Sequence, residues 1–209
     1  MVHRPEPAIA RPEYDAIVLA GGNSRRLEGT DKAVLEVGGR RLLDRVLSAV
    51  VEARRCIVVG PPRDLPAPTV TTTERPPGGG PVAGLAAGLD HVQAPLVAVL
   101  ACDLPFLTPD TLTALRAALD GPAGESADGS WLIDESGRPQ PMVSVFRTRF
   151  LRLAVSSLDQ VSNTSMRAML GRGTMVEVRG LESHTWDCDT WAAVDRARRR
   201  AAEHQLEES

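Results

Sequence analysis

Short apolar runs alternate with helix-like patterns through the first half of the chain. Strands are predicted where several apolar residues stand in a row, and helices where apolar residues recur every three or four positions. The predicted strands are 15–20, 56–59, 69–73 and 96–101, and the predicted helices are 41–54, 82–92 and 108–119. Such alternation favours a mostly parallel sheet with helices on both faces.

The pattern changes after Gly121. Small polar residues at 121–129 predict a loop, and 130–146 predicts two strands around a turn at 135–137. Helices are predicted near 148–157 and 165–170, a strand at 174–178 and a final helix from about 190 to 205, whose charged end is expected to be solvated. The whole pattern predicts a single three-layer, Rossmann-like α/β domain with an antiparallel section in its second half.

Composition and charge narrow the class of protein. The 209 residues are 43% hydrophobic but only 3% aromatic, which predicts one domain with an aliphatic core. A net charge of −3 gives no bulk attraction to nucleic acid or to an anionic membrane. Three cysteines without a C-x-x-C pair argue against a disulfide framework and for a reducing compartment. With no membrane-length apolar stretch and a polar, Pro-rich leader at 1–14, we expect a cytoplasmic protein.

The segment LAGGNSRRLEGTDKA (19–33) concentrates glycines and charges directly after the first predicted strand. Ligands of open α/β sheets bind at the carboxyl ends of strands. The segment matches neither G-x-x-x-x-G-K-[ST] nor G-x-G-x-x-G, but Gly21 and Gly22 leave backbone N–H groups accessible to phosphate oxygens. The positive charges come from Arg25, Arg26 and Lys32. The alternative is an ordinary glycine-rich turn with surface arginines. The combination of two glycines with three positive charges favours a bound triphosphate instead.

Two aspartates are candidate metal ligands. Asp103 follows the apolar strand 96–101, so its carboxylate is expected at the carboxyl edge of the sheet, where a hard cation can bind. Capping of the turn before Pro105 is the alternative. Asp189 precedes Thr190 and the last helix, where an N-cap role is equally compatible with its position. Asp187 is a further candidate.

Five motifs in order resemble the nucleotidyltransferases related to molybdenum cofactor guanylyltransferase. The first resembles L-A-G-G-x-S-x-R-M-G-x-x-D-K. The matching residues are Leu19, Ala20, Gly21, Gly22, Ser24, Arg26, Asp31 and Lys32. The others are PGGGPVAGL (77–85), CDLPFLTPD (102–110), RPQPMV (138–143) and DCDT (187–190), so the resemblance extends from Asp15 to about Ala197. The sequence departs from the pattern at Glu28, where a glycine is usual, and at Trp191, where a proline is usual.

The resemblance implies a nucleotidyltransferase domain over 15–205, after the leader and before a tail at 206–209. Such an enzyme transfers GMP from GTP to the phosphate of molybdopterin or molybdenum-molybdopterin and releases pyrophosphate, with Mg²⁺ as cofactor. Because the acceptor phosphate is already an anion, the reaction needs cations and alignment rather than a general base. This agrees with the four histidines, which form no recognisable catalytic group.

The resemblance also assigns roles to residues of this chain. The implied catalytic residues are Lys32, Arg26 and Asp103, and the implied metal ligands are Asp103 and Asp189. The implied nucleotide-binding residues are Leu19, Ala20, Gly21, Gly22, Lys32, Glu74, Gly79, Gly80 and Asp103. Gly60 stands where some members carry an asparagine that contacts the nucleotide. Candidates for holding the acceptor are Arg138, Gln140, Ser165 and Arg167, for which turn or helix roles are equally plausible.

Three alternatives and a set of partners accompany this interpretation. Cytidylyltransferases of the same pterin more often carry D-Q-P where this chain has Asp103-Leu104-Pro105, which favours guanylyl transfer. A non-catalytic nucleotide-binding regulatory module is the second alternative, supported by Glu28. An oxidoreductase is disfavoured by the missing G-x-G-x-x-G.

The expected partners are GTP, the pterin, and a molybdoenzyme or cofactor-carrier protein, without nucleic acid or membrane.

Overall fold

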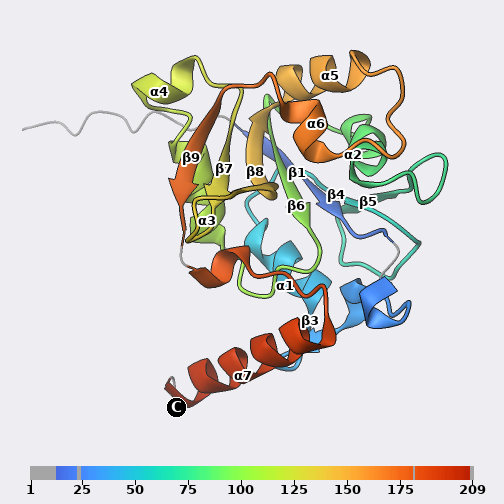
Figure 1. Ribbon diagram of the computed structural model, residues 1–209, viewed down its shortest axis with the longest axis vertical. Coiled ribbons are helices and arrows are strands. Elements are labelled where there is room, and N and C mark those ends of the chain that lie inside the picture. Colours follow the sequence, from blue (N-terminus) through green and yellow to red (C-terminus); the bar gives the residue numbers. More distant parts are fainter. Residues whose placement is uncertain (1–12, 23–24, 181, 208–209) are drawn as a thin grey trace, which may run out of the picture.

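The computed structural model describes residues 13–22, 25–180 and 182–207, and within them seven strands form one sheet (Figure 1). The strand order is β5-β4-β1-β6-β8-β7-β9. The strands are β1 (Tyr14–Leu19), β4 (Cys56–Val59), β5 (Thr69–Thr72), β6 (Leu96–Ala101), β7 (Gly129–Ile133), β8 (Pro139–Arg147) and β9 (Met175–Arg179). The predicted α/β class is therefore confirmed, and the expected leader at 1–14 lies almost wholly outside the described residues.

The strand directions place the loops that follow β1 and β6 side by side. β1 pairs in parallel with β4 and β6, with Leu19 opposite both Val59 and Ala101. Of the strands in this sheet, β8 alone runs in the opposite direction, because it pairs antiparallel with both β6 and β7. This is the antiparallel section that the sequence predicted for the second half of the chain. The glycine loop and Asp103 consequently leave the sheet at one edge, from neighbouring strands.

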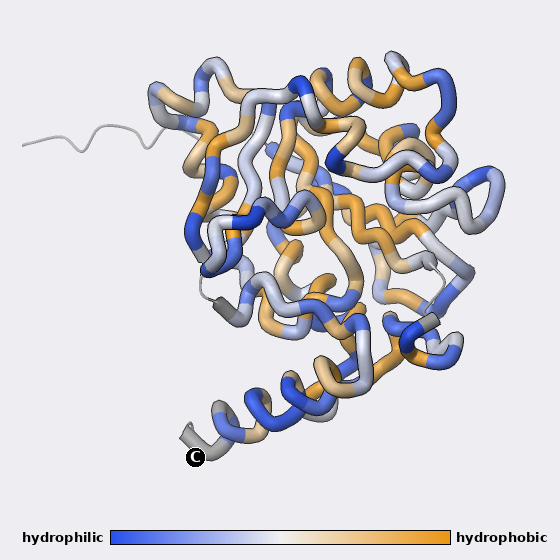
Figure 2. The backbone as a smooth tube through the Cα atoms, viewed as in Figure 1, coloured by the Kyte–Doolittle hydropathy of each residue, from blue (hydrophilic) through white to orange (hydrophobic). Residues whose placement is uncertain are grey.

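Helices cover both faces of the sheet because the strand residues alternate between two cores. Ala16 and Val18 of β1 belong to one apolar cluster, and Ile17 and Leu19 belong to the other. The first cluster includes buried residues of α1 (Leu42–Ala49) and α3 (Pro109–Ala117). The second includes buried residues of α2 (Pro81–Leu89), α5 (Thr148–Ser156) and α6 (Met166–Leu170). Figure 2 shows the hydrophobic central strands between these two layers.

A third, smaller core lies below the sheet in Figure 1, where α7 (Trp191–Glu207) packs against a short hairpin. The hairpin consists of β2 (Glu36–Val37) and β3 (Arg40–Arg41), which the sequence patterns did not predict. Ala197 and Ala201 are buried here with Val37. The expectation of a solvated helix end is therefore wrong for one face of α7, where apolar residues stand three and four positions apart among many charged ones.

Local signals explain where several elements begin and end. Thr108 caps α3 as predicted, since its hydroxyl accepts a hydrogen bond from the Thr111 N–H and Pro109 occupies the first turn. The helix α1 ends at Ala49, earlier than the predicted Arg54, and the predicted loop at 121–129 contains the short helix α4 (Pro122–Glu125). Short 3₁₀ helices occur at η1 (Arg25–Leu27), η2 (Lys32–Val34) and η3 (Glu182–Thr185). In the described part of the chain, no helix combines the length and apolarity needed to cross a membrane.

Candidate active site

Three charged side chains from distant parts of the sequence meet at the carboxyl edge of the sheet. The ammonium nitrogen of Lys32 donates hydrogen bonds to Asp103 Oδ2, at 2.8 Å, and to Asp189 Oδ1. Lys32 begins η2, Asp103 follows β6 after one residue, and Asp189 lies just before α7. The structure thus brings together three of the residues that the sequence singled out.

Backbone contacts explain how these side chains are placed. The carboxylate of Asp31 caps η2 by accepting a hydrogen bond from the Ala33 N–H, at 3.1 Å, which fixes the start of the turn that carries Lys32. The carbonyl of Asp103 accepts a hydrogen bond from the Cys188 N–H at 3.1 Å. This bond ties the segment before α7 to the end of β6, and it brings Asp189 beside Asp103.

Electrostatics keep Lys32 charged. Burial by itself lowers the pKa of Lys32, but the charges and hydrogen bonds of Asp103 and Asp189 outweigh that effect, so the pKa lies above its usual value. The Asp103 side chain is only 8% exposed, whereas the Asp189 side chain is 41% exposed. The site therefore consists of a buried carboxylate and a more accessible one, joined by a permanently protonated amine.

The glycine loop has the open backbone that the sequence predicted. Leu19 and Ala20 are buried, whereas Gly21 and Gly22 are exposed. Gly22 adopts φ 126°, a conformation that favours glycine. Asn23, Ser24 and the side chain of Arg25 lie outside the described residues, and Arg26 is exposed in η1.

Glu74, one of the implied nucleotide-binding residues, lies beside this loop. Its two carboxylate oxygens lie 3.5 and 3.6 Å from the point where a Cβ on Gly21 would be. Its Oε1 also accepts a hydrogen bond from the Gly78 N–H at 3.0 Å. Gly79 follows in the same loop, and Gly80 caps α2 with φ 89°. Glu74 thus connects the two glycine segments predicted to bind the nucleotide.

Arg63 is a residue of this region that the sequence analysis missed. Its guanidinium donates to the Ala20 carbonyl at 2.9 Å and to both carboxylate oxygens of Asp31 at 2.7 and 2.8 Å. It lies in the irregular, proline-rich connection between β4 and β5. No local motif marks it, and a three-dimensional contact is needed to find it.

The candidates for the acceptor side have local contacts in the structure. The Ser165 hydroxyl caps α6 by accepting a hydrogen bond from the Ala168 N–H, and Gln140 Nε2 donates to Asp134 Oδ2 in the turn between β7 and β8. Asp187 is exposed, and its pKa is raised by desolvation and by the charges of Asp189 and Asp103. Across the described ranges no three histidine, cysteine or acidic side chains converge as a metal centre, so Asp187 does not complete a three-carboxylate site.

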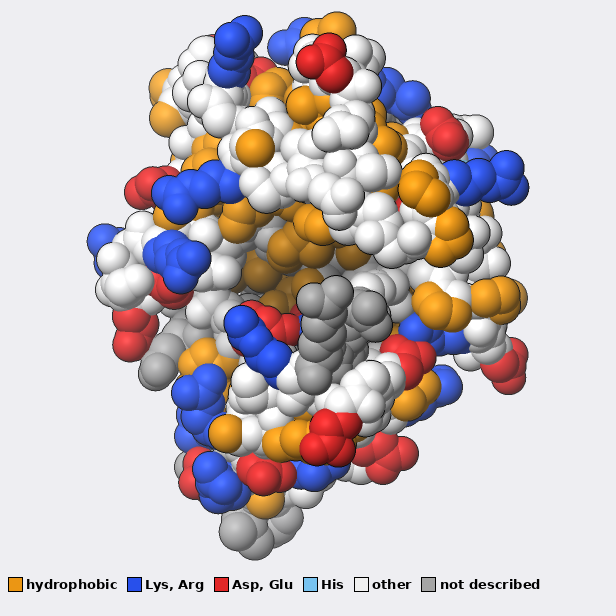
Figure 3. All heavy atoms as spheres, turned by 45° about the vertical axis from the view of Figure 1, so that its right-hand side comes forward, with side chains coloured by type: hydrophobic (Ala, Val, Ile, Leu, Met, Phe, Trp, Pro, Cys, Tyr) orange, Lys and Arg blue, Asp and Glu red, His pale blue; other side chains and the backbone are white. Residues whose placement is uncertain are grey.

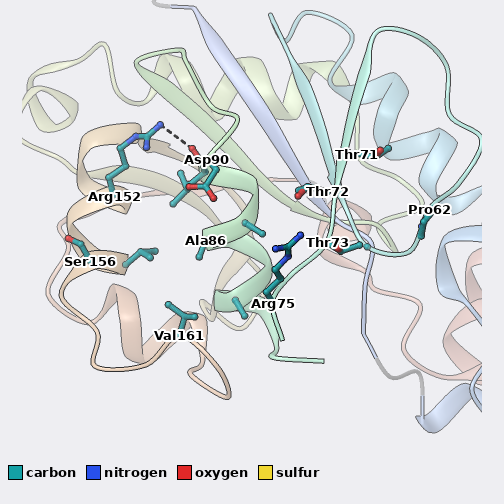
Figure 4. A pocket seen from close by; sticks show the side chains of 15 residues that line it. Pro62, Thr71, Thr72, Thr73, Arg75, Ala86, Asp90, Arg152, Ser156 and Val161 are labelled. Carbon is teal, nitrogen blue, oxygen red and sulfur yellow. Dashed lines mark hydrogen bonds between the residues drawn. The ribbon is translucent and has the colours of Figure 1, made fainter. Parts of the chain in front are cut away.

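A cavity of about 780 Å³ adjoins the glycine loops on the α2 side of the sheet (Figure 4). Its walls come from β5, α2 and α5, and Thr71, Thr72 and Arg75 are among the residues that line it. Lys32, Asp103 and Asp189 do not line it. Figure 3 shows a hollow with an apolar floor and charged side chains along its lower rim. The three charged residues stay the predicted reaction centre, because cations and carboxylates are what the predicted phosphate chemistry requires.

Comparison with known proteins identifies the family. Residues 16–177 match the family described as the MobA-like NTP transferase domain. A molybdenum cofactor guanylyltransferase of Burkholderia orbicola is 32% identical over 208 residues, covering 93% of this chain and 100% of the relative. A similarly named protein of Shewanella sp. is 29% identical and covers 70% of this chain and 79% of the relative.

Solved structures share the fold. Molybdopterin-guanine dinucleotide biosynthesis protein A from Archaeoglobus fulgidus superposes with a TM-score of 0.67 at 20% identity, covering 90% of this chain and 99% of that one. A 2-C-methyl-D-erythritol 4-phosphate cytidylyltransferase from Thermus thermophilus gives 0.64 at 22% identity, covering 91% and 99%. The family predicted from the motifs is confirmed: the chain belongs to the MobA-like NTP transferases.

Proposed function

We propose that this protein transfers GMP from GTP to the phosphate of molybdopterin, or of its molybdenum-bound form, and releases pyrophosphate. The observation that carries the proposal is the contact of Lys32 with Asp103 and Asp189 beside an open glycine loop. Relatives that align over nearly the whole chain and are named molybdenum cofactor guanylyltransferase support the choice of donor and acceptor.

The residues of the site suit nucleotidyl transfer. The exposed backbone of Gly21 and Gly22 receives phosphate oxygens, and Lys32 supplies a fixed positive charge to the α-phosphate or the leaving pyrophosphate. Glu74, beside Gly21, is placed to accept hydrogen bonds from the nucleoside. Arg26, exposed in η1, adds a further cation to the loop. The acceptor phosphate attacks without losing a proton, so orientation and charge carry the reaction.

The two carboxylates also fit Mg²⁺. The Lys32 ammonium nitrogen contacts one carboxylate oxygen of Asp103 and one of Asp189, so the two carboxylates lie close enough together to share one cation. Mg²⁺ commonly binds one or two carboxylates together with substrate phosphates, rather than a complete protein cage. We propose that these two residues hold Mg²⁺ in place of the Lys32 ammonium, which then contacts the phosphates instead, and that the metal when bound would neutralise the charge of the triphosphate.

Calorimetric titration with GTP and with CTP, each with and without Mg²⁺, tests the donor and the metal. Buried polar groups that pair with one base edge should reject the other base strongly, because they would be left unpaired. We expect tight, Mg²⁺-dependent binding of GTP and weak binding of CTP. A preference for CTP would support the cytidylyl alternative, and equal binding with and without Mg²⁺ would contradict the metal role.

The regulatory alternative rests on Glu28, which adds a negative charge to the loop. Glu28 is exposed in the structure, and Lys32, Asp103 and Asp189 remain in contact with one another. The retained charged group favours catalysis. The proposed protein partners, a molybdoenzyme or a cofactor carrier, follow from the proposed product.

A further inference from the structure

Arg63 joins the two ends of the glycine loop. Its Nη2 donates to the carbonyl of Ala20, where the chain leaves β1, and to the carboxylate of Asp31, where η2 begins. Its Nε adds a second contact to Asp31 Oδ2 at 3.2 Å. The Arg63 side chain is only 9% exposed, so the pair is well shielded on the arginine side. A two-pronged contact of this kind fixes orientation as well as distance.

Arg63 donates its hydrogen bonds to other groups of the protein. In addition to the contacts above, its Nη1 donates to the Pro61 carbonyl at 3.2 Å. Most of its donors are therefore used within the chain, and few remain for a ligand. We infer that Arg63 is a positioning residue, which holds the nucleotide loop in its working shape without itself contacting the reacting atoms.

The contact with Asp31 connects Arg63 to Lys32. Asp31 Oδ1 accepts hydrogen bonds from both Arg63 Nη2, at 2.8 Å, and the Ala33 N–H, at 3.1 Å. The first fixes the carboxylate, and the second fixes the first turn of η2. Lys32 lies between these two anchored residues, so its direction toward Asp103 depends on the position of Asp31.

The contact with Ala20 acts on the start of the loop. Gly60, in the same connection as Arg63, packs closely against Ala20. A Cβ added to Gly60 would lie 2.6 Å from the Ala20 carbonyl oxygen. Arg63, three residues further along the same connection, donates to that oxygen as well. Both contacts hold the peptide that precedes Gly21, whose backbone is exposed toward the proposed phosphate site.

Hydrogen–deuterium exchange of Arg63→Ala tests the inference without any assumption about activity. Peptides covering 20–34 should exchange at least tenfold faster than in the unaltered protein, while peptides covering 124–129 should be unchanged. The matched control is Arg147→Ala. Arg147 donates to the Ala127 and Gly124 carbonyls at the opposite edge of the sheet, so its loss should produce the reverse pattern. Unchanged exchange over 20–34 in Arg63→Ala would overturn the inference.

Kinetics supply the second readout, which rests on the proposed function. We expect Arg63→Ala to raise the KM for the nucleotide and to lower kcat, each by about tenfold, and Arg63→Lys to restore little because lysine lacks the planar fork. Guanidinium ion at millimolar concentration should partly restore the alanine variant, which a general loss of stability would not allow. In the Asp31→Ala background, the further change Arg63→Ala should alter KM and kcat by less than twofold. Fully additive effects of the two substitutions would overturn coupling through Asp31.

The two readouts separate failure of this inference from failure of the proposed function. If the unaltered protein releases no pyrophosphate but Arg63→Ala loosens 20–34 alone, the proposed function fails and the positioning role stands. If the unaltered protein is active and Arg63→Ala matches it in exchange and kinetics, the positioning role fails alone.

Discussion

The Asp103 carboxylate and the Lys32 ammonium lie 2.8 Å apart, although 71 positions separate them in the sequence. Lys32→Ala removes the fixed cation from this contact. We expect kcat for pyrophosphate release to fall by about a hundredfold or more, on the scale of losing one preorganised transition-state charge. Nucleotide binding should change less. Arg26→Ala is the comparison, and it should mainly weaken nucleotide binding; wild-type kinetics in both variants would contradict a catalytic role for the loop.

Asp103→Asn should abolish transfer while the fold is kept, because it removes a charge with almost no change in volume. The more exposed Asp189 should tolerate the same change better, with activity partly recovered at high Mg²⁺ concentration. Activity against Mg²⁺ concentration measures both effects. Asp110→Asn, in the exposed first turn of α3, is a control of equal chemistry outside the site. Near-normal turnover of Asp103→Asn in saturating Mg²⁺ would remove Asp103 from the ligand set.

The backbone of Glu28 has φ 55°, a left-handed conformation. Residues other than glycine and asparagine adopt it only at a cost in free energy. Glu28→Gly should therefore stabilise the protein by about 0.5–1 kcal/mol, since the relief of strain exceeds the added flexibility of the unfolded chain. The melting temperature should rise by about 2 °C. Glu28→Ala removes the charge but keeps the strained backbone, so it separates the two effects. A lower melting temperature for Glu28→Gly would refute the strain argument.

Gly60→Ala should disturb the start of the nucleotide loop. The added methyl group would lie 2.6 Å from the Ala20 carbonyl oxygen and 2.9 Å from the Gly21 nitrogen, and backbone atoms there have little freedom to move. We expect a destabilisation of about 1–3 kcal/mol and weaker nucleotide binding, by chemical denaturation and calorimetry. Gly171→Ala is the control, since its Cβ would meet ordinary contacts at 3.5 Å. Equal stability of the two variants would contradict the close approach.

Burial raises the pKa of the Cys56 thiol from 9.0 to about 12. Because the folded-state pKa is the higher one, this contribution to stability is complete below pH 9 and is lost as the pH rises toward 12. The free energy of unfolding should therefore fall more steeply over this range in the unaltered protein than in Cys56→Ala. Parallel curves from denaturant titrations at several pH values would show that the thiol is not responsible.

Sequence patterns predicted the central sheet well because its strands are buried on both faces. The strands at 56–59 and 96–101 are continuous apolar runs, and the structure has them at the same residues. The loop after β1 and Asp103 after β6 could be placed at one edge because parallel neighbours end together. The hairpin β2–β3 could not be predicted, since strands of two residues leave no periodic signal.

Local sequence patterns do not encode the long-range contacts of the site, although the resemblance to the family implied that Asp103 and Asp189 share it. Asp189 comes beside Lys32 through the bond from the Cys188 N–H to the Asp103 carbonyl, which no local pattern encodes. Arg63 occupies an irregular loop, and its partners are 32 and 43 positions away. The packing of α7 was missed for a related reason, because its apolar face is narrow and lies among charged residues.

Pyrophosphate release from GTP, measured with and without molybdopterin in the presence of Mg²⁺, tests the central claim most directly. The proposed function predicts release that requires the pterin, that is lost in Asp103→Asn, and that is much slower with CTP. Binding of GTP without any pterin-dependent release would contradict guanylyl transfer and favour a regulatory nucleotide-binding protein.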